Sequence, residues 1–70
     1  MLGVYFKARE ADEIKIGETT SLNRAGVYID VFLNAGEYEV TSWETEERED
    51  GTTVFDFGNT IGLFLVRKLK

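Results

Sequence analysis

The chain has 70 residues, a net charge of −5, a sequence pI of about 4.6, and no cysteine, histidine or proline. Hydrophobic residues make up 43% of it, which excludes a disordered chain. A domain of this length buries only ~60% of the surface that its unfolded chain exposes, so its core is small. The lack of cysteine excludes disulfides and thiolate metal sites, and the lack of histidine removes the commonest metal ligand. An acidic chain gains nothing from a phosphate backbone, which argues against general binding to nucleic acids or anionic membranes.

The expected location follows from two missing signals. No apolar stretch approaches the ~20 residues of a membrane helix. Residues 1–6 are too short and too uncharged for a signal peptide. We therefore expect a soluble, cytoplasmic protein with one β domain over residues 1–70.

The first third of the chain predicts two short strands with polar connections. Residues 2–6 and 13–17 alternate apolar and other residues, as half-buried strands do. Residues 7–13 have no apolar stripe and predict a surface loop or one helical turn. Residues 18–25 predict a polar connector, in which Ser21 could cap a single turn.

The middle of the chain gives the strongest strand prediction, over residues 26–33. Alternation places four aliphatic residues on one face and Tyr28 and Phe32 on the other. An Asn-Ala-Gly turn then leads into a return strand over residues 37–44. Trp43 is out of phase with the other apolar residues of this strand, so it faces outwards unless a bulge turns it inwards.

The last third predicts a hairpin and a final strand. Residues 45–51 form a charged loop that ends in Asp-Gly, a strong turn signal. Strands are expected over residues 52–57 and 61–69, and the apolar residues on both faces of the last one indicate a central strand or one that bridges two sheets. The whole pattern predicts an all-β fold, a small antiparallel barrel or two-layer sandwich of five to six short strands, like SH3-like or OB-like barrels in size.

No catalytic or metal-binding pattern is present. Neither histidine nor cysteine is available to activate a serine or threonine, and no phosphate-binding loop or dinucleotide fingerprint occurs. The acidic run over residues 44–50 lacks the ligand spacing of a calcium loop, which leaves weak cation binding as its only metal chemistry. The sequence predicts no enzyme activity, no cofactor and no metal site.

Two features suggest a binding function instead. Large aromatic residues on the second sheet face are unusual in a monomer; they could form a minor second core, a homo-oligomer interface or a contact with another molecule. The acidic run could orient a basic partner, or could only keep a hairpin soluble. The candidate partner-binding residues are Tyr28, Phe32, Trp43, Glu44, Glu46, Glu47, Glu49 and Asp50.

The preferred hypothesis is a small acidic protein-interaction module, for example an inhibitor that occupies a basic surface of a partner protein, for which compact phage-encoded proteins offer an analogy. One alternative is a structural subunit that self-associates through an aromatic sheet face. Another is a binder of single-stranded nucleic acid or oligosaccharide, which would combine stacking aromatics with the basic C-terminal cluster. That platform would consist of Tyr5, Tyr28, Phe32, Arg67, Lys68 and Lys70.

Overall fold

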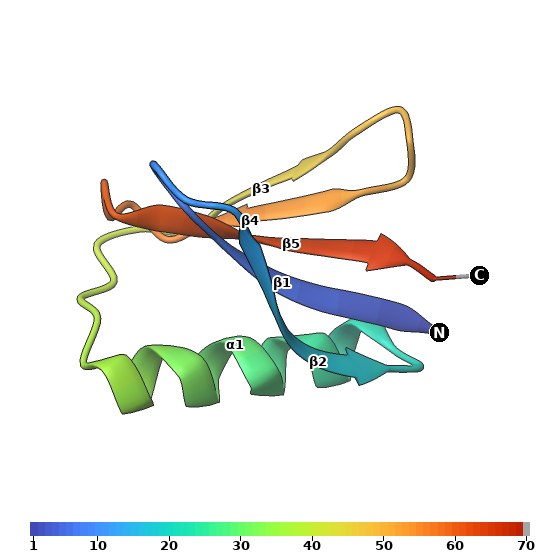
Figure 1. Ribbon diagram of the computed structural model, residues 1–70, viewed down its shortest axis with the longest axis horizontal. Coiled ribbons are helices and arrows are strands. Elements are labelled where there is room, and N and C mark those ends of the chain that lie inside the picture. Colours follow the sequence, from blue (N-terminus) through green and yellow to red (C-terminus); the bar gives the residue numbers. More distant parts are fainter. Residues whose placement is uncertain (70) are drawn as a thin grey trace.

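The computed structural model describes residues 1–69, which form one five-stranded antiparallel sheet with a helix across one face (Figure 1). The protein is mostly β, so the predicted class and the number of short strands are confirmed. Lys70, assigned above to the basic cluster, lies outside the described residues. The elements are β1 (Leu2–Ala8), β2 (Glu13–Thr19), α1 (Leu22–Gly36), β3 (Glu44–Glu47), β4 (Thr53–Asp56) and β5 (Gly62–Lys68).

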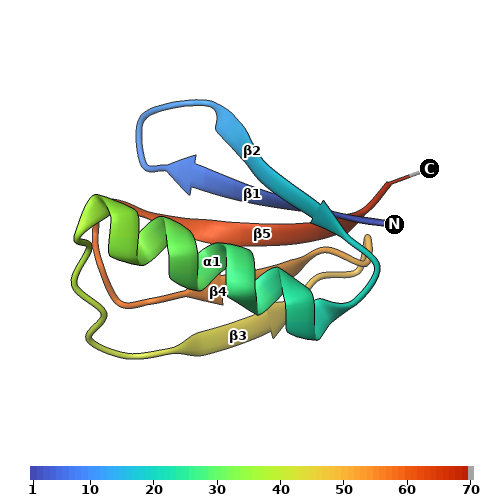
Figure 2. The ribbon, with the colours of Figure 1, turned by 90° about the horizontal axis from the view of Figure 1, so that it is seen from below.

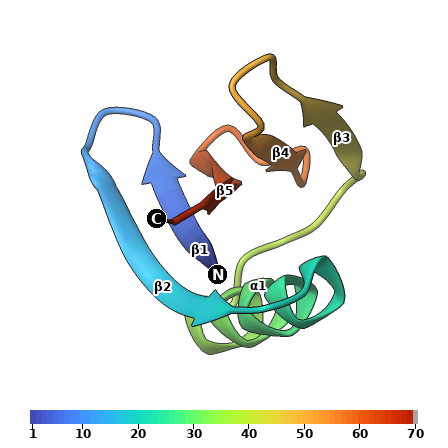
Figure 3. The same ribbon diagram turned by 90° about the vertical axis from the view of Figure 1, so that its right-hand side faces the viewer.

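The order of strands in the sheet is β2-β1-β5-β4-β3. Two hairpins, β1–β2 and β3–β4, form the two sides, and β5 pairs with β1 and β4 between them. The prediction that the last strand is central is therefore confirmed. The strands follow an arc from β2 to β3, and α1 lies on one side of that arc (Figure 3). Helix α1 also carries the chain from the β2 edge of the sheet to the β3 edge (Figure 2).

The strand predicted over residues 26–33 is wrong, because this segment is the middle of α1. A spacing of four residues joins Ala25, Ile29 and Leu33, which are the buried residues of the helix. Val27 and Val31 also fit the strand alternation, but in the helix they point to solvent and are 59% and 61% exposed. Packing of one helical face against the sheet thus outweighs the β propensity of these residues.

The helix begins at the predicted cap, Ser21, but runs to Gly36 instead of forming a single turn. The Ser21 hydroxyl accepts a hydrogen bond from the backbone N–H of Arg24 at 3.2 Å. At the other end Glu37 adopts a left-handed conformation with φ of 55°, and its N–H donates to the carbonyl of Asn34. The predicted turn and return strand over residues 37–44 are therefore wrong: residues 37–43 form a connection without regular secondary structure, and β3 begins only at Glu44.

The core lies between α1 and the facing side of β1 and β5. Its largest fully buried side chains are Val4, Phe57, Phe64 and Val66. Aromatic rings fill the end of the core near the helix C-terminus, with centroids of neighbouring rings 4.7 to 6.4 Å apart. The rings in this aromatic cluster are Phe6, Phe32, Tyr38, Phe57 and Phe64.

No helix among residues 1–69 is both long enough and apolar enough to cross a membrane.

Candidate protein-binding site

The acidic run forms a hairpin, and its first half is a strand rather than a loop. Residues 44–47 are β3, and a three-residue connection leads from Arg48 to Thr52. The N–H of Gly51 donates to the Arg48 carbonyl at 3.0 Å, and the N–H of Arg48 donates to the Thr52 carbonyl at 2.8 Å. Gly51 has φ of 86°, the left-handed position that glycine supplies in such hairpins. The Asp-Gly turn signal is confirmed, and the predicted loop over residues 45–51 is corrected to a strand and a tight turn.

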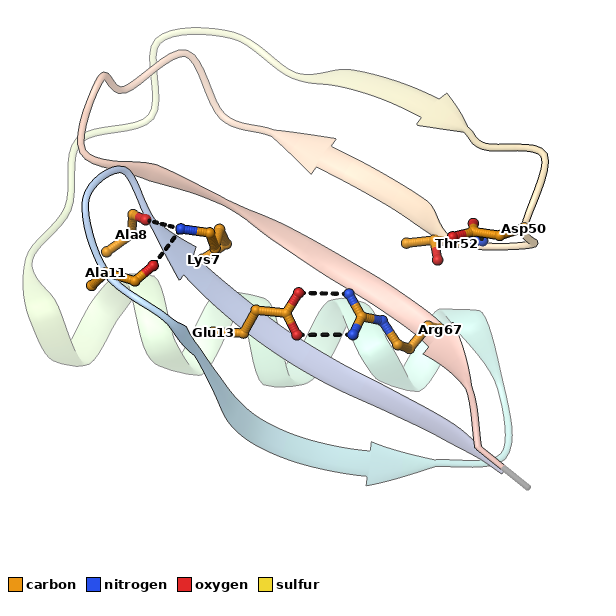
Figure 4. Close-up of polar contacts among 7 residues, drawn as sticks. All are labelled: Lys7, Ala8, Ala11, Glu13, Asp50, Thr52 and Arg67. Atoms are coloured by element: carbon orange, nitrogen blue, oxygen red, sulfur yellow. Dashed lines mark hydrogen bonds and ion pairs between the residues drawn. The ribbon is translucent and has the colours of Figure 1, made fainter.

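A side-chain hydrogen bond stabilises this turn. The Asp50 carboxylate accepts from the backbone N–H of Thr52 at 2.9 Å (Figure 4). This backbone hydrogen bond is the main reason why the pKa of Asp50 lies below its usual value, and the nearby Arg48 lowers it further. The lowered pKa favours the charged form of Asp50 in the folded protein.

Five of the seven residues from 44 to 50 are acidic, and all seven are exposed. Pairing with β4 places Glu44 opposite Asp56 and Glu46 opposite Val54, on the sheet face away from the helix. Thr45 pairs with Phe55, which packs against the core, so Thr45 and Glu47 lie on the helix side. The hairpin thus presents negative charge on both of its faces.

An open groove adjoins the helix side of this hairpin. Helix α1 packs against β2, β1 and β5, and its backbone makes no close approach to β3 or β4 within the described residues. The space between α1 and the hairpin is a groove of about 400 Å³. It is lined by Leu22, Asn23, Gly26, Ile29, Asp30, Trp43, Thr45 and Phe55.

Trp43 lies where the groove meets the acidic strand. Its ring is 6.3 Å from that of Phe57, centroid to centroid, so one side of the indole packs on the core. The residue is nevertheless 48% exposed. Trp43 is therefore partly packed on the core and partly exposed to solvent, and it forms an apolar wall of the groove beside Glu44.

The structure separates the other two predicted aromatic residues from this site. The Tyr28 ring lies on the flank of α1 against Gly17 of β2, where a Cβ atom would come within 2.6 Å of the ring. Phe32 belongs to the aromatic cluster, 4.7 Å from Phe6 and stacked on Tyr38 at 5.6 Å. Trp43 directly precedes the acidic strand β3, whereas no sheet face carries Tyr28, Phe32 and Trp43 together.

Arg67 lies on the sheet face away from the helix, since its neighbour in β5, Val66, belongs to the core. Arg67 forms two hydrogen bonds to the Glu13 carboxylate, at 2.8 and 2.6 Å (Figure 4). Its guanidinium lies 4.8 Å from the centre of the Tyr5 ring. The hydrogen bonds to Glu13 raise the pKa of Arg67 above its usual value. Of the proposed stacking residues only Tyr5 shares this face, since Phe32 lies beneath the sheet with α1.

Sequence reasoning missed the helix side of the groove. Leu22, Gly26, Ile29 and Asp30 share one helical face, but they do so only at a spacing of three to four residues. Interpretation of the segment as a strand hides that spacing, because the side chains of a strand alternate every two residues. Among residues 1–69 no group of acidic side chains is arranged to hold a metal ion.

Comparisons with protein-family models, with curated proteins and with solved structures find no match to this chain.

Proposed function

We propose that this protein is a non-catalytic interaction module that binds a basic surface of a partner protein through the β3–β4 hairpin and the adjoining groove. One observation carries the proposal: an acidic edge strand and a half-exposed tryptophan border the same open groove. An inhibitor that covers a functional basic surface is the form of this role that we favour.

Charge supplies orientation and speed of association. The five carboxylates of residues 44–50 act against one arginine, and the whole chain has a net charge of −5. Complementary charge of this kind raises association rates from about 10⁵–10⁶ to as much as 10⁸–10⁹ M⁻¹s⁻¹ at low salt. A like-charged surface is repelled by the same groups, so the hairpin selects for basic partners.

Apolar surface supplies residence time. Trp43 and Phe55 line the groove, and tryptophan is among the residues that most often dominate interface energy. A standard interface buries ~800 Å² on each partner. That is about one sixth of the 4933 Å² that this chain exposes.

The non-catalytic part of the proposal follows from residue types. The polar lining of the groove is an amide, a carboxylate and a hydroxyl, from Asn23, Asp30 and Thr45. A chain without histidine or cysteine has few means to activate a nucleophile at neutral pH.

Self-association has less support from the structure. The aromatic residues expected to form a self-complementary face are divided between the core, the flank of α1 and the groove. Two acidic hairpins would also repel each other at a symmetric contact.

The proposal is tested by selecting random 12-residue peptides from a displayed library, first against the wild type. The same selection is made against the triple variant Glu46→Gln, Glu47→Gln, Glu49→Gln. We expect the wild type to enrich lysine and arginine, and the triple variant to lose that enrichment. Association of the selected peptides should slow about tenfold in the triple variant and become less sensitive to salt.

A charge-matched control distinguishes binding at the hairpin from attraction to the overall negative charge of the protein. The variant Glu10→Gln, Asp12→Asn, Glu18→Gln removes the same charge at the β1–β2 side of the sheet. It should select the same basic peptides as the wild type. Equal enrichment by all three proteins, or no basic enrichment by any of them, would contradict the proposed function.

A further inference from the structure

We infer that the partner segment binds as an added β-strand on the free edge of β3, and that it is an extended peptide in which basic and apolar residues alternate. This inference rests on the proposed function and specifies the partner's conformation and sequence pattern. The free backbone edge of β3, its two faces and its charge support this inference.

The free edge of β3 offers backbone hydrogen bonds. β3 ends the sheet, and no segment among residues 1–69 pairs with its outer side. Arg48 bonds to Thr52 across the hairpin, and bonding in an antiparallel pair alternates from residue to residue. Glu46 and Glu44 therefore face β4 with their N–H and C=O groups, whereas those of Thr45 and Glu47 point to the open edge. An exposed edge of this kind is a template for strand addition.

The two faces of β3 fix the pattern of the added strand. A residue paired with Thr45 would place its side chain on the helix side, beside Trp43 and Phe55 in the groove, so an apolar residue fits there. Residues paired with Glu44 and Glu46 would lie on the other face, where a basic side chain meets a carboxylate. At ~3.3 Å per residue, the four residues of β3 span about 13 Å and match a ligand of five to six residues.

Charge also determines which strands are excluded. A second copy of β3 would set glutamates against glutamates, because every position of β3 except Thr45 is a glutamate. The other edge of the sheet, β2, is irregular, with a register shift opposite Val4 and Tyr5, and α1 packs against it. The occupant that fits is therefore a basic strand from another protein, at the β3 edge.

The test uses an eight-residue peptide of alternating lysine and valine, capped at both ends, and two N-methylated forms of it. One form is methylated on the valines and the other on the lysines, so each loses the N–H groups of one edge of the peptide strand. Fluorescence of Trp43, the single tryptophan of the chain, reports binding in the groove.

We expect the parent peptide to bind, and one methylated form to bind at least tenfold more weakly than the other. An antiparallel strand would be disrupted by methylation of the valines, whose N–H groups then face β3, and a parallel strand by methylation of the lysines. Amide exchange at Thr45 and Glu47 should slow when the parent binds.

Equal affinities of the two methylated forms, or no binding of the parent at low salt, would overturn the inference. The proposed function is tested separately, by the peptide selection against the wild type and against the triple variant Glu46→Gln, Glu47→Gln, Glu49→Gln. If both methylated forms bind as well as the parent and lose affinity in that variant, the basic contact stands and only the added strand is wrong.

Discussion

Replacement of Phe32 by alanine distinguishes a core residue from a binding residue. The ring lies 4.7 Å from Phe6, 5.6 Å from Tyr38 and 5.7 Å from Phe64, centroid to centroid, so its removal opens a cavity among three aromatic neighbours. Loss of a buried phenylalanine costs about 3–5 kcal/mol. Phe32 is only partly buried, so we expect a loss of about 3 kcal/mol, at the lower end of that range.

A loss of about 3 kcal/mol is a large part of the total free energy of unfolding. A chain of this length has a free energy of unfolding of ~4–10 kcal/mol. Since 1 kcal/mol shifts the Tm of a small domain by ~4–8 °C, Phe32→Ala should lower it by about 12–24 °C. Circular dichroism during heating, with urea unfolding followed through Trp43 fluorescence, measures both quantities.

The matched control is Val31→Ala, one residue earlier in α1. Val31 is 61% exposed, and its variant should stay within about 0.5 kcal/mol of the wild type. Light scattering over micromolar to near-millimolar protein completes the experiment. A Phe32→Ala protein with unchanged stability, or one that turns a wild-type oligomer into a folded monomer, would refute the core assignment and favour the aromatic interface.

Three further predictions concern the helix end, the helix flank and the hairpin. Glu37→Gly should raise the Tm by ~4–8 °C, because glycine relieves about 1 kcal/mol of left-handed backbone strain, whereas Glu37→Ala should give no such gain. Gly17→Ala should cost about 1–3 kcal/mol in urea unfolding, since the new Cβ meets the Tyr28 ring; additive effects in the double variant with Tyr28→Ala would argue against that contact. Because folding lowers the pKa of Asp50, its charge stabilises the protein at neutral pH, and this contribution is lost as the pH falls below about 4. The Tm of Asp50→Asn should therefore lie below that of the wild type at pH 7 and approach it in acid; a constant difference would show that the charge has no such effect.

Local signals in the sequence were enough to predict several elements. Strands β1, β2 and β5 follow from alternation, and the central place of β5 follows from apolar residues on both of its faces. Ser21 and Gly51 each form a hydrogen bond with a residue three positions away in the chain. The cap and the turn could therefore be predicted without knowledge of the fold. The negative charge of the hairpin is likewise a property of composition.

The helix and the groove were decided by tertiary structure. Residues 25–33 satisfy both a spacing of two and a spacing of four, and β propensity differs by only ~1 kcal/mol between residue types. Burial of Ala25, Ile29 and Leu33 against β1, β2 and β5 is worth more, and it selects the helix. Once α1 covers those strands it leaves the helix side of β3 and β4 open, so Trp43 becomes the wall of a groove. No residue spacing in the sequence predicts that groove, because it lies between α1 and the β3–β4 hairpin, two segments that do not pack closely against each other.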